Sequence, residues 1–310
     1  MNLRQLEVFQ AVMQTGNMSA AGRLIRITPS AVSKTIAHAE LQLGYLLFSR
    51  VRGTLVPTPE AQALFAASSQ IHRQLDELRH TALNLRQPEG GLVRIAAIPS
   101  VTHAFLPAVL EQHALRAPRV QIEVRTLHQD QIAQALLTRA VDVGLGFYPH
   151  PHPQVHSEIL VSGPLFIAIT REIWQRAVRV NRSDPLSFLA NTPMIPLLGD
   201  DPMRPHMAEL ARQLGVHQEL GIQVQTSQLA LELVKRGMGW TMVEFLTASN
   251  LDAATMAAVP VRDLPPIPFY AYHATRWPPD RQAARLLASL PGLLDRALAR
   301  PHAQPAQPAE

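Results

Sequence analysis

The chain has 310 residues, of which 47% are hydrophobic, so it is long enough for a small domain followed by a larger one with its own core. It contains no cysteine, which excludes disulfide bonds and thiolate metal sites, and no apolar run approaches the roughly 18 residues of a membrane span. Residues 1–58 contain six basic and two acidic residues, and the rest of the chain is neutral. The whole net charge of +4 therefore lies in the first fifth of the sequence, where it favours a polyanionic partner.

The first 28 residues predict two helices. Apolar residues at helical spacing indicate a first helix that ends at Gly16; they are Leu3, Leu6, Phe9, Val12 and Met13. Ser19 is expected to cap a second, short helix. The predicted packing face of this second helix consists of Ala20, Ala21, Leu24 and Ile25. The start, MNLRQLEVFQAV, has no basic region followed by an apolar run, so we expect a soluble, cytoplasmic protein without a secretory signal.

A third helix is predicted to begin after Thr28, because Pro29 fits the first helical position. Its apolar side consists of Val32, Ile36, Ala39 and Leu43. Its other side holds hydrogen-bonding and basic residues without an acid, namely Ser30, Ser33, Lys34, Thr35 and His38. Such a face suits the major groove of DNA, where phosphates attract cations and base edges pair with short polar side chains. The alternative is a helical hairpin with an ordinary solvated face.

The segment LFSRVRGTLVPT alternates like a two-stranded ribbon with Arg52 and Gly53 at its tip. A basic hairpin directly after two crossed helices is typical of a wing, and its arginines are expected to reach a phosphate or a minor groove. An ordinary solvated turn is the alternative. The candidate DNA-binding residues are therefore Thr28, Pro29, Ser30, Ser33, Lys34, His38, Arg50 and Arg52.

Another helix is predicted to begin at Thr58-Pro59-Glu60 and to continue to about residue 86. Leu64, Ile71, Leu78 and Leu85 recur every seven residues, and the companion positions are Ala61, Ser68, Leu75 and Ala82. These residues form a narrow apolar stripe, here called the seam, which is buried when two copies of the helix pair. The repeat therefore predicts a dimerisation helix. The alternative, a helix lying on its own effector domain, calls for a wider apolar stripe. Pairing would present two recognition helices about one DNA turn apart.

Residues 1–86 resemble the amino-terminal region of the LysR-type transcriptional regulators. The resemblance rests on LRQLEVFQAV, on NMSAAGRLIRITPSAVSKTIAHAELQLGYLLFSR, and on the wing and long helix that follow in the same order and spacing. Two departures stand out. Many members have glutamine and proline where this chain has Pro29 and Ser30, so an amide that pairs with adenine is missing. Gly22 replaces a larger helix former, at a cost of about 1 kcal/mol unless close packing requires glycine.

Pro88-Glu89-Gly90-Gly91 is a predicted hinge, after which strands alternate with helices, as in a parallel α/β sheet. The first predicted run is LVRIAAI, a helix over 104–115, VQIEVRT, a helix over 129–137, and VDVGLGF. The second is PLFIAIT, PMIPLL, a helix over 203–214, GIQVQT, a helix over 227–236, and GWTMV. IPFYAYHA and a helix over 281–298 are expected to return to the first lobe, and the tail 301–310 is expected to be disordered.

Two such α/β lobes resemble the effector domain of the same family, which is similar to periplasmic solute-binding proteins. Ligands then bind between the lobes, at strand carboxyl ends and helix amino termini. The candidate effector-binding residues are Ser100, Val101, Thr102, His128, Gln129, Phe147, Asp201, Arg204, Thr226 and Ser227. Ser100 and Thr102 are expected to hold a carboxylate at a helix start, and Arg204 to clamp it. The alternative for each is a simple helix cap or a solvated arginine.

The sequence favours neither a metal site nor an enzyme. His150, His152 and His156 lie in and after a proline-rich stretch without a nearby thiolate or carboxylate, so we expect no metal there. No nucleophile elbow, paired acids or phosphate loop is present, and no cofactor is expected.

The predicted fold class is α/β with an N-terminal all-α winged helix-turn-helix, a long linker helix and a two-lobed, periplasmic-binding-protein-like effector domain. The predicted limits are 1–58 for the DNA-binding domain, 59–89 for the linker helix and hinge, and 90–300 for the effector domain. Within the last, the first lobe spans 90–162 and 268–300, and the second spans 163–267.

The resemblance implies a dimeric or tetrameric regulator that binds double-stranded DNA and responds to a small molecule. Its alternatives are a solute-binding protein without a regulatory role and a general nucleoid protein. The segments RVRGTLVPT and VQTSQLALELVKRGMGW are most similar to the branch of lysine-biosynthesis and opine-responsive regulators, which indicates an amino acid or related carboxylate as effector.

Overall fold

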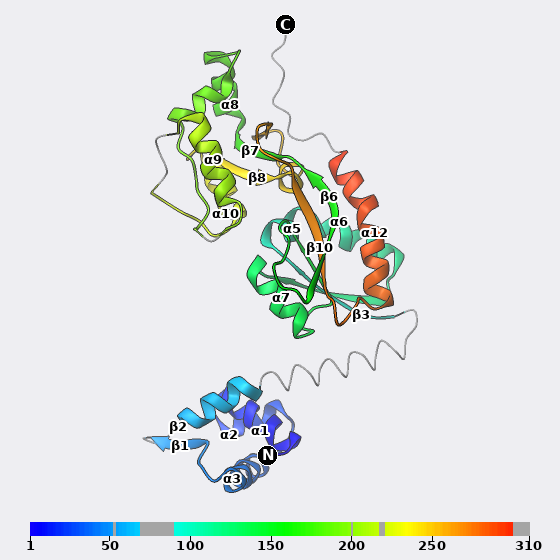
Figure 1. The fold of residues 1–310 in the computed structure, drawn as a ribbon. Coiled ribbons are helices and arrows are strands. Elements are labelled where there is room, and N and C mark those ends of the chain that lie inside the picture. Colours follow the sequence, from blue (N-terminus) through cyan, green and yellow to red (C-terminus); the bar gives the residue numbers. More distant parts are fainter. Residues whose placement is uncertain (52–53, 69–89, 200, 217–220, 300–310) are drawn as a thin grey trace. The chain divides into compact units, whose positions relative to one another are not determined.

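The computed structural model describes residues 1–51, 54–68, 90–199, 201–216 and 221–299. The chain divides into two compact units, Met1–Thr81 and Ala82–Glu310 (Figure 1). Within the described ranges, no helix has both the length and the apolar character needed to cross a bilayer.

The first unit combines helices with a two-stranded ribbon. Its elements are α1 (Leu3–Thr15), α2 (Met18–Leu24), α3 (Pro29–Leu43), β1 (Phe48–Val51) and β2 (Thr54–Pro57). Residues 59–68 are also helical. The strands are antiparallel, with Val51 opposite Thr54. The predicted tip of the ribbon, Arg52 and Gly53, lies outside the described residues. Helices and ribbon therefore follow in the predicted order.

The start of α2 differs from the sequence prediction. Asn17, not Ser19, is the N-cap, since its side-chain oxygen accepts from the N–H groups of Ser19 and Ala20 at 2.8 and 3.1 Å. Ser19 lies inside the first turn. Leu24, predicted to pack, is 57% exposed, so the buried face of α2 is formed by its small residues Ala21 and Gly22.

Gly22 is required by a close approach of the backbone. A Cβ atom added at this position would lie 2.6 Å from the carbonyl oxygen of Ile27. The chain folds back here because the N–H of Ile27 donates to the carbonyl of Gly22 at 2.9 Å. The departure from the family pattern at this position therefore has a packing reason.

The core of the first unit includes the beginning of the linker helix. Ala61 is fully buried in this core, and Leu64 packs partly buried against it. Gln10 of α1 donates to the carbonyl and hydroxyl oxygens of Ser68, both at 3.1 Å. Ala61 and Ser68, predicted to lie in a seam between copies, are thus buried within their own unit. The remaining seam positions, Ile71, Leu75, Leu78, Ala82 and Leu85, lie outside the described residues.

The second unit contains two sheets, which define its lobes. The lobe 1 sheet has the order β4-β3-β5-β10-β6, and the lobe 2 sheet has the order β8-β7-β9. The strands are β3 (Gly91–Ala97), β4 (Val120–Thr126), β5 (Val143–Gly146), β6 (Val155–Gly163), β7 (Leu165–Thr170), β8 (Thr241–Glu244), β9 (Met256–Val261) and β10 (Ile267–Ala274). β3, β4 and β5 are parallel, as predicted, whereas β10 is antiparallel to β5 and β6.

Helices cover the sheets. They are α5 (Pro99–Ala104), α6 (Leu106–Arg116), α7 (Gln129–Leu137), α8 (Arg171–Val180), α9 (Arg204–Leu214), α10 (Ser227–Lys235), α11 (Phe245–Ala248) and α12 (Arg281–Leu298), with a 3-10 turn at Pro185–Asn191. Alternating side chains of β3 serve two clusters, since Ile95 and Ala97 belong to the main core whereas Ala96 packs with residues of α7. α12 contacts α6 and β3 (Figure 1).

Three details of the second unit differ from the sequence predictions. The predicted helix over 104–115 is interrupted at Phe105, so α5 and α6 are separate. β6, which leads from lobe 1 to lobe 2, was not predicted, and neither were α8, α11 and β9. The predicted strands at 193–198 and 221–226 form only isolated bridges, from Met194 to Trp240 and from Leu197 to Val224. The regular sheet of lobe 2 is consequently antiparallel and small.

Gly22→Ala is expected to lower the free energy of unfolding of the first unit by about 1–3 kcal/mol, because the new methyl group overlaps a backbone oxygen that cannot move independently. Denaturant unfolding of the full-length chain measures this. Gly292→Ala in α12 is the control, since a Cβ there meets no atom within 4 Å and alanine favours helix. Equal or greater stability of Gly22→Ala would contradict the packing argument.

Candidate functional site

The exposed face of α3 is the first candidate surface. Thr28 caps the helix by accepting from the N–H of Ala31 at 3.3 Å, and Pro29 occupies its first turn. Burial of the apolar side fixes the rotation of the helix; the buried residues are Val32, Ile36 and Ala39. The opposite side is exposed and contains Thr28, Pro29, Ser30, Ser33, Lys34 and His38. All six candidate residues of α3 and its cap therefore share one accessible surface.

Two polar residues of α3 are engaged within the unit. The Thr35 hydroxyl donates to the carbonyl of Ala31 at 2.8 Å and is half-buried, so it lies apart from the exposed face. Glu40 accepts from the N–H groups of Leu47 and Phe48 at 2.7 and 3.1 Å. The one acid of α3 is thereby directed to the start of the ribbon, and the described exposed face contains no acid.

The sequence analysis missed two apolar residues on this face. Ala37 is exposed, and Leu41 is 84% exposed. Apolar side chains at such positions can contact the methyl group of thymine. Their place on the exposed side follows from the same helical spacing as Ser33 and Lys34, but attention to polar residues alone passes over them. Of the wing arginines, Arg50 lies in β1 and Arg52 lies outside the described residues.

The second candidate site is a cavity of about 660 Å³ between the two lobes of the second unit. It is lined by the starts of α5, α7 and α10, by the loop after β5, by the segment before α9, and by the end of β8. Six predicted effector residues line it, namely Ser100, His128, Gln129, Asp201, Thr226 and Ser227. Residues distant in sequence are thus brought together at strand and helix ends.

Four predicted effector residues do not line this cavity. Val101 and Phe147 are fully buried in the hydrophobic core. Thr102 donates back to the carbonyl of Ile98 at 3.1 Å, as a residue inside a helix commonly does. Arg204 donates to the carbonyl of Leu197 at 2.7 Å, so its guanidinium supports the backbone. The expected arginine clamp is therefore not present in the described lining.

Glu244 is the main cavity residue that the sequence analysis missed. It lies at the end of β8, is only 7% exposed, and accepts from the hydroxyls of Ser100 at 3.2 Å and Thr247 at 3.1 Å. Burial raises the pKa of its carboxyl above the ordinary value, and the charge of Asp201 adds to the rise. An acid at the end of the apolar run GWTMV was the available signal. A carboxylate ligand at Ser100 would lie beside this acid, which disfavours that part of the prediction.

The cavity is acidic among the residues that the structure describes. Burial also raises the pKa of Asp201, against the N–H of Met203 and the charge of His128, which lower it. The buried Tyr148 hydroxyl also lines the cavity, and burial together with the charges of Glu244 and Asp201 raises its pKa. No arginine or lysine is present in the described lining, and the cationic candidates are His128 and His150. Such surroundings attract a positively charged group.

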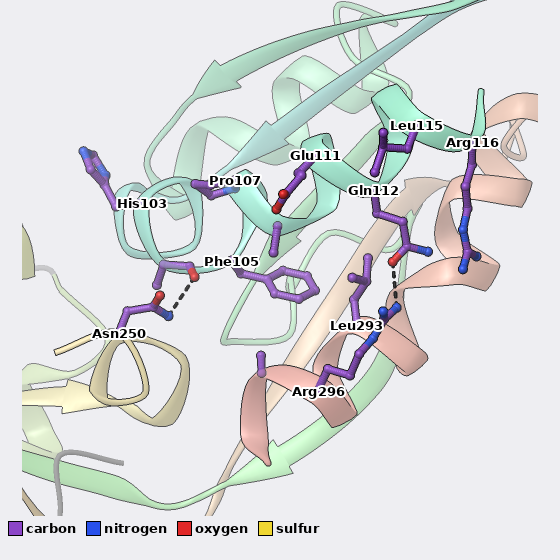
Figure 2. Close-up of a pocket in the computed structure, with 13 residues that line it drawn as sticks. His103, Phe105, Pro107, Glu111, Gln112, Leu115, Arg116, Asn250, Leu293 and Arg296 are labelled. Atoms are coloured by element: carbon purple, nitrogen blue, oxygen red, sulfur yellow. Dashed lines mark hydrogen bonds between the residues drawn. The ribbon is translucent and has the colours of Figure 1, made fainter. Parts of the chain in front are cut away.

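No metal centre is found within the described residues, where no group of three histidines or acids is placed to hold an ion. A second cavity of about 560 Å³ lies between α6 and α12 (Figure 2). There Arg296 donates to Gln112 at 2.7 Å, and Asn250 donates to the carbonyl of Ala104 at 2.8 Å. None of the predicted effector residues lines it. The cavity between the lobes is therefore the better candidate site.

Glu244→Gln is expected to make the stability of the ligand-free protein less dependent on pH. Because the folded-state pKa of Glu244 is raised, its contribution is full below the ordinary glutamate pKa and is lost as the pH rises through the raised value. Thermal midpoints from about pH 4 to pH 8 measure this decline, which the uncharged glutamine lacks. Glu158→Gln, at an exposed position, is the control. Parallel pH profiles for wild type and Glu244→Gln would contradict the assignment.

Comparisons with known proteins give one family match for each of the two units. The model of the LysR substrate binding domain matches residues 86–294, and that of the bacterial regulatory helix-turn-helix proteins of the lysR family matches residues 3–62. The HTH-type transcriptional regulator DgcR of Pseudoalteromonas sp is 29% identical over 248 residues, which cover 80% of this chain and 84% of the relative. The octopine catabolism/uptake operon regulatory protein OccR of Rhizobium meliloti is 34% identical over 144 residues, 46% of this chain and 48% of the relative.

The crystal structure of full-length CbnR complexed with its target DNA resembles this chain with a TM-score of 0.70 at 18% identity, and the match covers 96% of this chain and 100% of the other. At this identity the likeness shows the fold alone. The family match over residues 86–294 covers more than half of the chain, and the helix-turn-helix match excludes a solute-binding protein without a regulatory part. The chain belongs to the LysR family of DNA-binding transcriptional regulators, with an effector-binding domain after the helix-turn-helix unit.

Proposed function

We propose that this regulator reads DNA with the exposed face of α3 and contacts the flanking backbone with its wing. The proposed contacts are Thr28, Pro29, Ser30, Ser33, Lys34, His38, Arg50 and Arg52. The observation that carries the proposal is an exposed helical face with Lys34 at its centre and the helix's one acid, Glu40, bonded elsewhere. The net charge of residues 1–58 supports it, since phosphates attract cations.

The remaining parts follow the same proposal. The DNA-binding domain spans 1–58, the linker helix and hinge 59–89, and the effector domain 90–300. Two copies pair through the linker helix, for which the seven-residue apolar spacing is the support. We propose a cytoplasmic location and no catalytic activity, because a regulator of this family acts by binding DNA.

For the effector we propose a small molecule that carries both an amino group and a carboxylate, bound between the lobes. The N–H groups at the starts of α7 and α10 suit a carboxylate. The acids Asp201 and Glu244 suit an ammonium group, and no described lysine or arginine of the lining competes for them. OccR is named for octopine catabolism and uptake, and an opine bears an amino nitrogen and carboxylates.

Lys34→Ala is expected to weaken binding about tenfold to duplexes that the protein has selected from a random pool. The slope of log affinity against log salt concentration should fall by the amount that corresponds to about one phosphate contact. Fluorescence anisotropy at several salt concentrations measures both. The control is Lys235→Ala in α10, whose ammonium pairs with Glu232. Unchanged affinity and salt slope for Lys34→Ala would refute the assignment. Loss that is equal on selected and unrelated duplexes would identify Lys34 as a backbone contact.

Compounds with both an amino group and a carboxylate are expected to raise the thermal midpoint of the full-length protein, whereas matched carboxylic acids without nitrogen have little effect. The reason is that two acids line the cavity, Asp201 and Glu244, and their ionised forms attract an ammonium group but repel an anion that brings no cation. A thermal-shift screen of amino acids against their deaminated analogues measures the difference. Asp201→Asn should abolish it, and Glu158→Gln should leave it intact. Stabilisation by nitrogen-free acids or by apolar aromatics alone would overturn this effector class.

A further inference from the structure

A chain of two side-chain hydrogen bonds connects the start of α1 to the exposed face of α3. The N–H of Asn2 donates to Oε1 of Gln5 at 2.6 Å. The other end of the same amide, Nε2 of Gln5, lies 2.9 Å from Nδ1 of His38. The side chain of Gln5 therefore bridges a helix terminus and a candidate DNA contact.

The first bond fixes the direction of the second. Asn2 offers a backbone N–H, so the atom facing it must be the amide oxygen of Gln5, and a flipped amide would set two donors against each other. The amide nitrogen, which only donates, then faces His38. Nδ1 of His38 must accept, and in the neutral ring the proton is carried by Nε2.

The surroundings hold this arrangement in place. Gln5 is only 4% exposed, and its own N–H donates to the side chain of Asn2 at 2.9 Å, which completes a capping box. His38, by contrast, is exposed and lies one turn after Lys34 on the same face of α3. The buried amide thus determines which hydrogen-bonding atom an exposed ring can offer.

We propose that Gln5 is a positioning residue for DNA readout, which holds His38 as an Nε2–H donor and so selects a base with a major-groove acceptor on the strand facing it. The proposal rests on the proposed reading of DNA by α3. Guanine offers two acceptors in the major groove, whereas cytosine offers only an amino donor. The base facing His38 is therefore expected to be guanine in preference to cytosine.

The first test observes the ring directly. Long-range ¹H–¹⁵N spectra of the full-length protein with ¹⁵N-labelled histidine distinguish the two neutral tautomers, and the spectrum of His38→Asn assigns the signal. Wild type is expected to show the Nε2–H form at His38, and Gln5→Met a mixture of forms. Gln14→Met, at an exposed position of the same helix, should leave the signal unchanged. An Nδ1–H form in wild type would overturn the proposal.

The second test measures base preference by selection from a random duplex pool. Gln5→Met removes the acceptor for the N–H of Asn2, so its thermal midpoint is expected to fall slightly. Measured well below that midpoint, it should lose about two- to tenfold of the preference for guanine over cytosine at one position of each half-site, while its affinity for unrelated duplexes changes less. Identical preferences in wild type and Gln5→Met would refute this inference alone. If wild type selects no sequence at all, or if Lys34→Ala has no effect, the proposed function itself fails.

Discussion

The burial of Val32, Ile36 and Ala39 determines which side of α3 faces solvent, and the properties of the first unit follow from that rotation. With these residues fixed at steps of three and four, Ser33 and Lys34 must be exposed. The same rotation directs Glu40 toward the ribbon, where it accepts from two strand N–H groups. One helix therefore positions the exposed surface, anchors the wing and removes its own negative charge from the surface.

In the second unit, Glu244 has a comparable role between the lobes. It belongs to a strand of lobe 2, yet its carboxyl accepts from Ser100 at the start of α5 in lobe 1. An ionised carboxyl accepts a stronger hydrogen bond than a neutral one. A ligand ammonium beside Glu244 favours the ionised form, so it also strengthens the contact between the lobes. If the proposed effector places an ammonium group beside Glu244, its charge is coupled to the contact between the lobes through one side chain, as a ligand requires in order to favour one lobe arrangement over another.

Local signals predicted much of this molecule. The limits of α7 and α12 match the sequence predictions, and Thr28 with Pro29 correctly predicted the start of α3. These signals are reliable because helix caps and apolar periodicity depend only on neighbouring residues. Choices between equivalent residues were less predictable. Asn17 and Ser19 are both good capping residues two positions apart, and only packing decides between them.

The candidate effector site was harder to predict, because its chemistry depends on contacts distant in sequence. The guanidinium of Arg204 is engaged by a carbonyl of a preceding loop, which no local pattern reveals. Glu244 looked like an ordinary acid at a strand end, and its burial arises from the approach of another lobe. Sequence periodicity located the strand and helix ends, and six predicted residues at these ends line the cavity. It did not reveal the acidic character of the cavity.

The seven-residue repeat of the linker helix also has a local use that the sequence could not distinguish from pairing. Ala61 is buried in the core of the first unit, and Ser68 accepts from Gln10 of α1, so these two positions are occupied within one copy. The proposed pairing of two copies therefore cannot use Ala61 and Ser68. Residues 59–68 are fixed to α1, and α1 packs on α3, so the same core orients both the start of the linker helix and the exposed face of α3. If two copies pair as proposed, the spacing of their two DNA half-sites depends on this core as well as on the pairing contacts.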